Sequence, residues 1–226
     1  METLFFKLFG RFLSPSEQAA WRVIFTERRI SAYHRQGIQY IQQHSLYKPA
    51  KINLGSGEHK KEGFLNVDLF PGGDVTLDLR KDLPFESGFC DFIFSEHCIE
   101  HFEYPTSAYK LIKECLRVLK PGGIFYFSVP ETEWPLKDYI SKGKEGYIEQ
   151  CNIHKWHPDY CTTPMEHINF HFRQAEEHKF AYDFETAHKM LTDIGFIDVK
   201  LREFDPLLDA THRKIGSLFV SANKPS

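Results

Sequence analysis

The sequence lacks three features that would each indicate a particular class of protein. It has no basic run and its net charge is −3, so nothing electrostatic indicates a nucleic-acid partner. It has no apolar segment long enough to span a bilayer and no secretory signal, which favours a soluble protein. Its five cysteines form no C-x-x-C pair, which favours free thiols in a reducing, cytoplasmic location.

The composition that remains is that of an ordinary folded chain. The 226 residues suit one large domain, or one domain with an insertion. Hydrophobic residues make up 42% and charged residues 26%, which excludes disordered and collagen-like classes.

The first part of the chain is predicted to be helical. Residues 4–13 are apolar but are broken by Lys7, Gly10 and Arg11. We expect a helix packed on the domain or on a second subunit, with peripheral membrane contact as the alternative. Aliphatic residues at helical spacing within 16–45 predict one or two further helices, ended at Lys48-Pro49. Residues 1–48 would thus form N-terminal helices that could act as a lid, on a monomer or a homodimer.

Short apolar runs alternate with helical patterns over residues 49–226, which predicts an α/β fold. Strands are expected at 50–54, 64–67, 75–77, 90–94, 124–129, 196–201 and 216–222. Helices are expected from 106 to 119, stopped by a glycine turn at 120–123, and from 183 to 195. The sequence therefore predicts a Rossmann-like, seven-stranded, mostly parallel sheet with helices on both faces. Residues 131–182 interrupt the pattern and are interpreted as an insertion on the substrate side.

The stretch from Lys51 to Leu79 is the centre of the functional prediction. Its three apolar runs end at Gly55-Ser56-Gly57, at Asp68 and at Asp78. In open α/β sheets, ligands bind at the carboxyl ends of such strands. Glycine permits close approach of a nucleoside, Asp68 could accept both ribose hydroxyls, and Asp78 could reach an adenine amine beside Leu79.

A dinucleotide is disfavoured by two departures from the G-x-G-x-x-G pattern. Lys60 stands where the third glycine would be. Residues 57–64 also leave no room for the long helix that presents a pyrophosphate, so we expect a single turn there.

Several motifs in order resemble those of class I S-adenosylmethionine-dependent methyltransferases, and within them the small-molecule branch. They are Leu54–Gly57, Asn66–Asp68, Asp78-Leu79, Leu83–Phe85, Phe89–Asp91, Ile99–His101 and Arg117–Gly123. The resemblance implies a seven-stranded sheet whose last strand is antiparallel, and S-adenosylmethionine as cofactor. It implies that the cofactor-binding residues are Gly55, Ser56, Gly57, Asp68, Leu69, Asp78, Leu79, Ser95 and His101. Asn53 replaces the acid usual in the first motif of this family.

The predicted reaction is methyl transfer to a small molecule, most readily at a hydroxyl of a sugar or secondary metabolite. The candidate general bases are His97, Glu131 and His178, which follow strand ends or lie in the insertion. The alternatives are attack on the aminobutyryl carbon with release of methylthioadenosine, or cofactor binding without catalysis.

Two further interpretations are disfavoured. The insertion holds a set of histidines and cysteines, but without a zinc-type spacing, so we expect no metal. This set is Cys151, His154, His157, Cys161, His167 and His171. Methylation of nucleic-acid bases is disfavoured because residues 95–98 read Ser-Glu-His-Cys, not Asn/Asp-Pro-Pro-aromatic.

Overall fold

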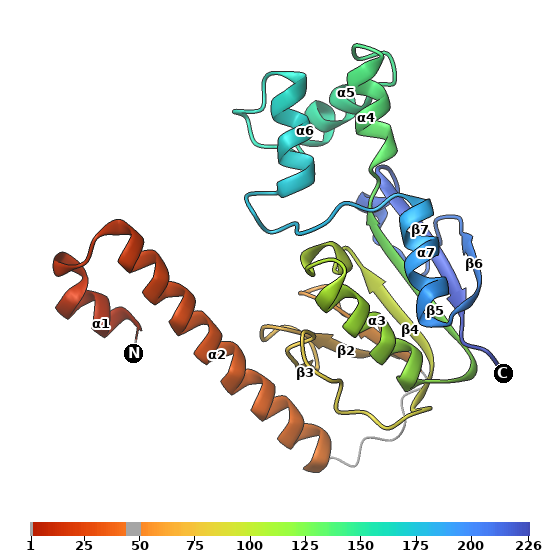
Figure 1. Cartoon of the computed structure of the whole chain (residues 1–226), viewed down its shortest axis with the longest axis horizontal. Helices are drawn as coiled ribbons and strands as arrows, with labels where there is room; N and C mark the ends of the chain where they lie inside the picture. Colours follow the sequence, from red (N-terminus) through yellow and green to blue (C-terminus); the bar gives the residue numbers. More distant parts are fainter. Residues whose placement is uncertain (1, 44–50) are drawn as a thin grey trace.

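The computed structural model of the chain describes residues 2–43 and 51–226 and contains a seven-stranded sheet (Figure 1). Its strand order is β3-β2-β1-β4-β5-β7-β6. The strands are β1 (Lys51–Leu54), β2 (Leu65–Asp68), β3 (Val75–Thr76), β4 (Cys90–Glu96), β5 (Leu119–Pro130), β6 (Ile197–Leu201) and β7 (Ser217–Asn223). Neighbouring strands within the run β3-β2-β1-β4-β5 pair in parallel, and β7 is antiparallel to both β5 and β6. The predicted Rossmann-like, seven-stranded, mostly parallel sheet with an antiparallel last strand is confirmed.

Two amphipathic helices build the core on one face of this sheet. Helices α3 (Thr106–Val118) and α7 (Phe184–Ile194) pack against each other and against β5, β6 and β7. The apolar face of α3 is buried at Ala108, Leu111, Ile112, Cys115 and Val118. Helix α7 begins and ends where the sequence predicts. Asp183 Oδ1 accepts a hydrogen bond from Thr186 N at 2.8 Å, and Gly195 ends the helix with φ 113°.

The end of α3 differs from the prediction. The helix stops at Val118, and Leu119 is already extended (φ −65°, ψ 142°) and pairs with Cys90. Burial of Leu119 in this pairing explains why strand β5 begins before the glycines and runs through the predicted turn. Gly122 nevertheless has φ 75°, the left-handed conformation expected for it.

Residues 55–64 connect β1 to β2 through turns alone, so no helix follows β1. The expectation that this crossover is too short for a long helix is confirmed. Side chains alternate along the strands, and the face away from α3 and α7 carries half-buried rings. Phe92 lies 5.9 Å from Phe64 and 5.0 Å from Tyr126 between ring centroids.

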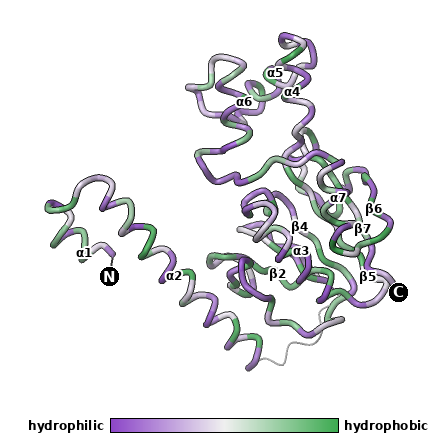
Figure 2. Tube along the Cα trace, viewed as in Figure 1, coloured by the Kyte–Doolittle hydropathy of each residue, from purple (hydrophilic) through white to green (hydrophobic). Residues whose placement is uncertain are grey.

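Helix α1 (Glu2–Phe9) and the short 3-10 helix η1 (Gly10–Phe12) precede α2 (Pro15–Gln43). Helix α1 and the first half of α2 extend away from the sheet, as Figure 1 shows. Phe5 packs on α2, with its ring 4.7 Å from that of Trp21 and 5.2 Å from that of Phe25. Figure 2 shows the hydrophobic residues along α1, of which several are exposed; they are Leu4, Leu8 and Phe9, with Phe12 beyond the helix.

Helix α1 therefore packs on α2, and its contact with a second subunit or a membrane surface stays a prediction. Within residues 2–43 and 51–226, no helix has the length and apolar character needed to cross a membrane. The predicted helix break at Lys48-Pro49 and the domain boundary between residues 48 and 49 lie outside the described residues.

Residues 131–182 form a lobe of three short helices beyond the end of β5 (Figure 1). They are α4 (Glu133–Ile140), α5 (Tyr147–His154) and α6 (Pro164–Arg173). Helix α6 starts with a capping box between Thr163 and Glu166, which satisfies two backbone N–H groups.

The second half of α2 packs on the edge strand β3 at a glycine. A Cβ atom at Gly37 would lie 2.0 Å from the carbonyl oxygen of Thr76, far inside van der Waals contact. The buried residues of α2 are Ile30, His34 and Gly37, so the glycine sets how closely helix and strand approach.

We expect Gly37→Ala to lower the free energy of unfolding by about 1–2 kcal/mol. Alanine favours a helix by about 1 kcal/mol over glycine, but forcing a methyl group into a packed contact costs more. Urea unfolding of both proteins measures this difference. Gln36→Ala is the matched control, because Gln36 is exposed on the same turn. A Gly37→Ala protein at least as stable as the wild type would contradict the packing described.

Candidate functional site

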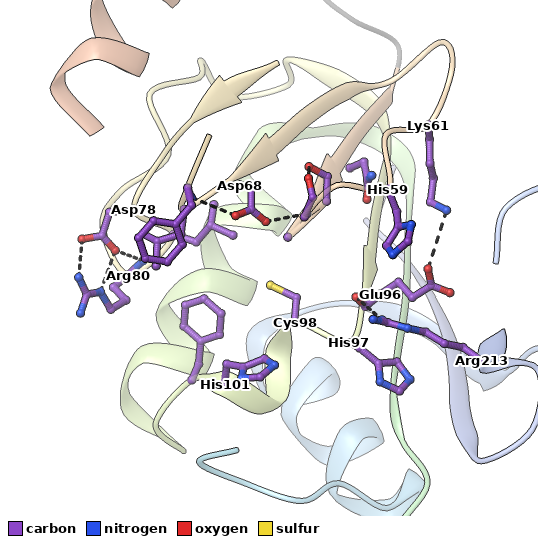
Figure 3. A pocket seen from close by; sticks show the side chains of 18 residues that line it. His59, Lys61, Asp68, Asp78, Arg80, Glu96, His97, Cys98, His101 and Arg213 are labelled. Atoms are coloured by element: carbon purple, nitrogen blue, oxygen red, sulfur yellow. Dashed lines mark hydrogen bonds and ion pairs between the residues drawn. The ribbon is translucent and has the colours of Figure 1, made fainter. Parts of the chain in front are cut away.

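The carboxyl ends of β1, β2 and β4 border a cavity of about 510 Å³ (Figure 3). A second cavity, of about 340 Å³, lies between this edge and the insertion. His97 and Arg213 line both cavities, so the two meet at these side chains.

The floor of the first cavity depends on Gly55. This residue has φ 71°, and a Cβ atom there would lie 2.4 Å from Cys98 Sγ. The backbone N–H groups of Gly55 and Ser56 donate to the carbonyl oxygen of Val67, at 2.9 and 3.1 Å. The turn after β1 is thereby held against β2 on one side and against the end of β4 on the other.

Asp68, at the end of β2, is oriented by backbone groups. Its Oδ2 accepts a hydrogen bond from Gly57 N at 2.8 Å, and its Oδ1 accepts one from Phe70 N at 3.0 Å. Figure 3 shows this carboxylate at the wall of the cavity. Asp68, the predicted ribose ligand, thus also holds the glycine turn in place through Gly57.

Asp78 is buried and already paired with a cation. Arg80 donates to it from Nε at 2.8 Å and from Nη2 at 3.0 Å, and the same guanidinium bonds Glu27 of α2 at 2.9 Å. Burial opposes ionisation of Asp78, but the Arg80 hydrogen bonds outweigh it and hold the pKa of the carboxyl below its ordinary value. Its backbone N–H donates to His34 Nδ1 at 3.1 Å. Helix α2 therefore contributes directly to this corner of the site.

Eight of the nine predicted cofactor residues line the first cavity. They are Gly55, Ser56, Gly57, Asp68, Leu69, Asp78, Leu79 and His101. Ser95 is buried within β4 and is not among the residues lining either cavity. Asn53, which replaces the usual acid, lines the cavity, and its amide nitrogen donates to Asn66 Oδ1 at 3.0 Å.

The three candidate bases lie in different surroundings. His97 and His178 line the second cavity. The Glu131 carboxylate instead accepts hydrogen bonds from the backbone N–H groups of Glu133 (3.0 Å) and Trp134 (2.6 Å), at the start of α4. Glu131 is therefore placed as a helix cap outside the residues that line the two cavities.

His97 has an unusual backbone for a residue other than glycine, with φ 48°. Such a conformation is costly and is found most often at functional sites. Its Nε2 lies 2.8 Å from Ser217 Oγ, and burial lowers the pKa of the ring well below its ordinary value.

The second cavity is lined mainly by aromatic and imidazole side chains. The insertion supplies Tyr147, Trp156, His157, Phe170, His171, Gln174 and His178, and the segment before β7 supplies His212, Arg213 and Ile215. The sequence prediction did not include the residues before β7. A usable signal was present, because an antiparallel last strand starts at the carboxyl edge of its parallel neighbours, and so the loop before it lies there too.

Buried ion pairing fixes that loop. Arg202 donates to both oxygens of Asp209 at 2.6 Å, in a pair that is almost wholly buried. Ala210 N donates to Glu96 Oε1 at 2.9 Å, and Arg213 Nη1 donates to the carbonyl oxygen of Glu96 at 3.0 Å. These bonds bring the Arg213 guanidinium to the junction of the cavities (Figure 3).

A chain of hydrogen bonds crosses the insertion. Tyr147 Oη lies 2.7 Å from His171 Nδ1 and 3.2 Å from His157 Nε2, and His157 Nδ1 lies 2.9 Å from His167 Nδ1. Burial lowers the pKa of both His157 and His171 to about 4, so these rings are neutral at pH 7. Of the six residues considered for a metal, Cys151, His157 and His167 come together within 4.8 Å.

The insertion is held in shape by the fully buried Asp138. Its Oδ1 accepts hydrogen bonds from the backbone N–H groups of Glu145 (2.8 Å) and Gly146 (2.9 Å), and its Oδ2 accepts one from Ile148 N (3.0 Å). One side chain thus organises the turn between α4 and α5, and with it the position of Tyr147.

We expect Asp138→Ala to lower the free energy of unfolding by roughly 2–4 kcal/mol, because it removes a fully buried carboxylate that accepts three backbone hydrogen bonds. Thermal or urea unfolding measures the loss. Glu133→Ala is the control, since its exposed ion pair with Lys137 contributes about 0.5 kcal/mol or less. Equal stability of the two variants would contradict the role assigned to Asp138.

Comparison with known proteins finds one family match, over part of the chain. A protein-family model described as "Methyltransferase domain" matches residues 58–127. No curated protein matches the chain. A solved SAM-dependent methyltransferase from Archaeoglobus fulgidus is 16% identical, with 89% of this chain and 99% of that chain covered and a TM-score of 0.49.

Two longer solved proteins are similar over part of their length. Haemonchus contortus phosphoethanolamine N-methyltransferase 2 is 14% identical over 85% of this chain and 53% of that one, with a TM-score of 0.46. The CurJ carbon methyltransferase is 17% identical over 78% of this chain and 48% of that one, also with a TM-score of 0.46. The chain thus spans about half the length of these two proteins. The match of residues 58–127 to a methyltransferase domain agrees with the resemblance to methyltransferases seen in the motifs.

Proposed function

We propose that the protein transfers the methyl group of S-adenosylmethionine to a hydroxyl of a small molecule bound in the second cavity. The observation that carries this proposal is the junction of two cavities at His97 and Arg213. The first is built from the predicted cofactor motifs and the second from the insertion. Methyl transfer requires two ligands to meet in this way.

The chemistry of the first cavity supports a nucleoside cofactor. Asp68 is the acceptor for ribose hydroxyls, and the glycine turn allows close approach of the amino-acid part. Leu79, Phe70 and Phe102 supply apolar walls of the kind that an adenine ring needs. Because Asp78 is paired with Arg80, its contact with adenine would use a carboxylate that is already oriented.

The second cavity supports a small acceptor with a polar substituent. Its aromatic and imidazole lining suits a ring, such as that of a sugar or a secondary metabolite, and Arg213 offers a half-buried cation to a polar or anionic group.

In the proposed reaction, the acceptor oxygen lies in line with the sulfur–methyl bond, roughly 3–3.5 Å from the methyl carbon. The oxygen forms the new bond to carbon, and the carbon–sulfur electron pair stays on sulfur. Ser217 also lines the cavity, so the acceptor proton can pass through the Ser217 hydroxyl to His97 Nε2. His178 is the second candidate for this proton, and nothing in the surroundings of Glu131 supports a catalytic role for it.

Product analysis tests the proposed activity. The protein is incubated with S-adenosylmethionine labelled in its methyl group and with a panel of hydroxylated small molecules. Formation of S-adenosylhomocysteine together with a labelled acceptor supports methyl transfer. Methylthioadenosine would instead show attack on the aminobutyryl carbon, and tight cofactor binding without turnover of any acceptor would favour a binding protein.

We expect Asp68→Ala to weaken S-adenosylmethionine binding at least about tenfold, because a hydrogen bond to a charged group contributes about 1.5–3 kcal/mol. Isothermal titration calorimetry measures the change. The Kd of Asp68→Asn should lie between those of the wild type and Asp68→Ala, because asparagine keeps one oxygen that can accept a hydrogen bond from Gly57 N or Phe70 N. Asp91→Ala is the control, as Asp91 is exposed and pairs with Lys120. An unchanged Kd in Asp68→Ala would overturn the assignment of the ribose site.

A further inference from the structure

Glu100 has a carboxylate whose surroundings the proposed methyl transfer does not explain. It lies in the short 3-10 helix η2 (Ile99–His101), is 2% exposed, and neither oxygen has a hydrogen-bond partner among the described residues. An isolated buried carboxylate is costly, and proteins usually pair such a group with a cation or use it to bind a metal. The absent partner is therefore expected to be a ligand.

Two histidines face this carboxylate with a nitrogen to spare. His101 Nδ1 lies 3.1 Å from the carbonyl oxygen of Glu177, and His178 Nδ1 lies 3.0 Å from that of His171. A carbonyl only accepts hydrogen bonds, so each Nδ1 carries the proton and each Nε2 keeps a lone pair. His101 Nε2 lies 4.0 Å from Glu100 Oε1.

We propose that Glu100, His101 and His178 bind a divalent transition-metal ion of the Zn²⁺ type. One ligand atom from each residue lies within 4.8 Å of the other two. Two imidazoles and one carboxylate form a ligand set typical of catalytic zinc, with a fourth position left for water or substrate. The backbone carbonyls that bind the two Nδ1–H groups fix the tautomer and the orientation of each ring, as at known zinc sites.

The site lies where the two cavities meet. His101 lines the first cavity and His178 the second, while His97 Nδ1 approaches the same Glu100 oxygen at 3.7 Å. The role of the metal in catalysis rests on the proposed function: a metal at this site would bind the acceptor hydroxyl and lower its pKa. The hydroxyl would lose its proton to water or His97, and its oxygen would then attack the methyl carbon.

The second histidine cluster is the weaker candidate. Cys151, His157 and His167 also lie within 4.8 Å of one another. Both nitrogens of His157 are already engaged, however, one with Tyr147 Oη and the other with His167 Nδ1. The unpartnered carboxylate belongs to the Glu100 cluster.

Metal binding can be measured without any acceptor. Purified full-length protein is stripped with EDTA, titrated with Zn²⁺ against a chromogenic chelator, and analysed for metal by mass spectrometry. We expect one Zn²⁺ per chain. Loss of a residue that only supports a metal ligand typically lowers metal affinity by about 10- to 100-fold. Loss of a ligand itself, in Glu100→Gln or in His178→Gln, should therefore lower the Zn²⁺ affinity by at least about 100-fold. His188→Ala should bind as the wild type does, because His188 is exposed on α7.

Cobalt distinguishes the two clusters. Co²⁺ bound by Glu100, His101 and His178 should show no thiolate-to-metal charge-transfer band, whereas ligation by Cys151 would produce one. Such a band, no stoichiometric binding, or unchanged affinity in both variants would overturn the proposed site.

Titration of S-adenosylmethionine into the same preparations separates this result from the proposed function. Cofactor binding without metal binding would reject the metal alone, and failure of cofactor binding would reject the methyltransferase proposal.

Discussion

The contact between Gly55 and Cys98 is the constraint on which the site depends. Strands β1 and β4 are neighbours, and the turns that follow them touch so closely that a Cβ atom at residue 55 would lie 2.4 Å from the cysteine sulfur. This contact sets the floor of the first cavity. It also sets where η2 begins, immediately after Cys98, and therefore where Glu100 and His101 lie. One glycine thus positions both the first cavity and the proposed metal ligands.

Sequence patterns predicted the parts of this edge that local rules determine. Strand ends followed by glycine or aspartate predicted that Gly55, Gly57 and Asp68 lie at one edge of the sheet, because parallel strands end at the same edge. All three line the first cavity. Ser95 shows the limit of the same rule. Strand β4 continues to Glu96, two residues beyond the predicted end, so Ser95 lies inside the sheet and not past it.

The second cavity could not be predicted in the same way, because long-range contacts build it. Helices α4, α5 and α6 are short, and the turn between the first two depends on the buried carboxylate of Asp138, which no periodicity reveals. Arg213 reaches the junction only because the Arg202–Asp209 pair and Glu96 hold its loop. Such pairs join residues that are distant in sequence or that lie in irregular backbone.

The N-terminal helices are coupled to the first cavity through charge as well as packing. The short crossover after β1 carries no helix, and α2 instead packs on the edge strand β3. Glu27 and Asp78 share the guanidinium of Arg80, and His34 accepts the backbone N–H of Asp78. Any displacement of α2 would therefore break bonds to the predicted adenine ligand. A lid movement of these helices would therefore change the surroundings of Asp78, which lines the first cavity.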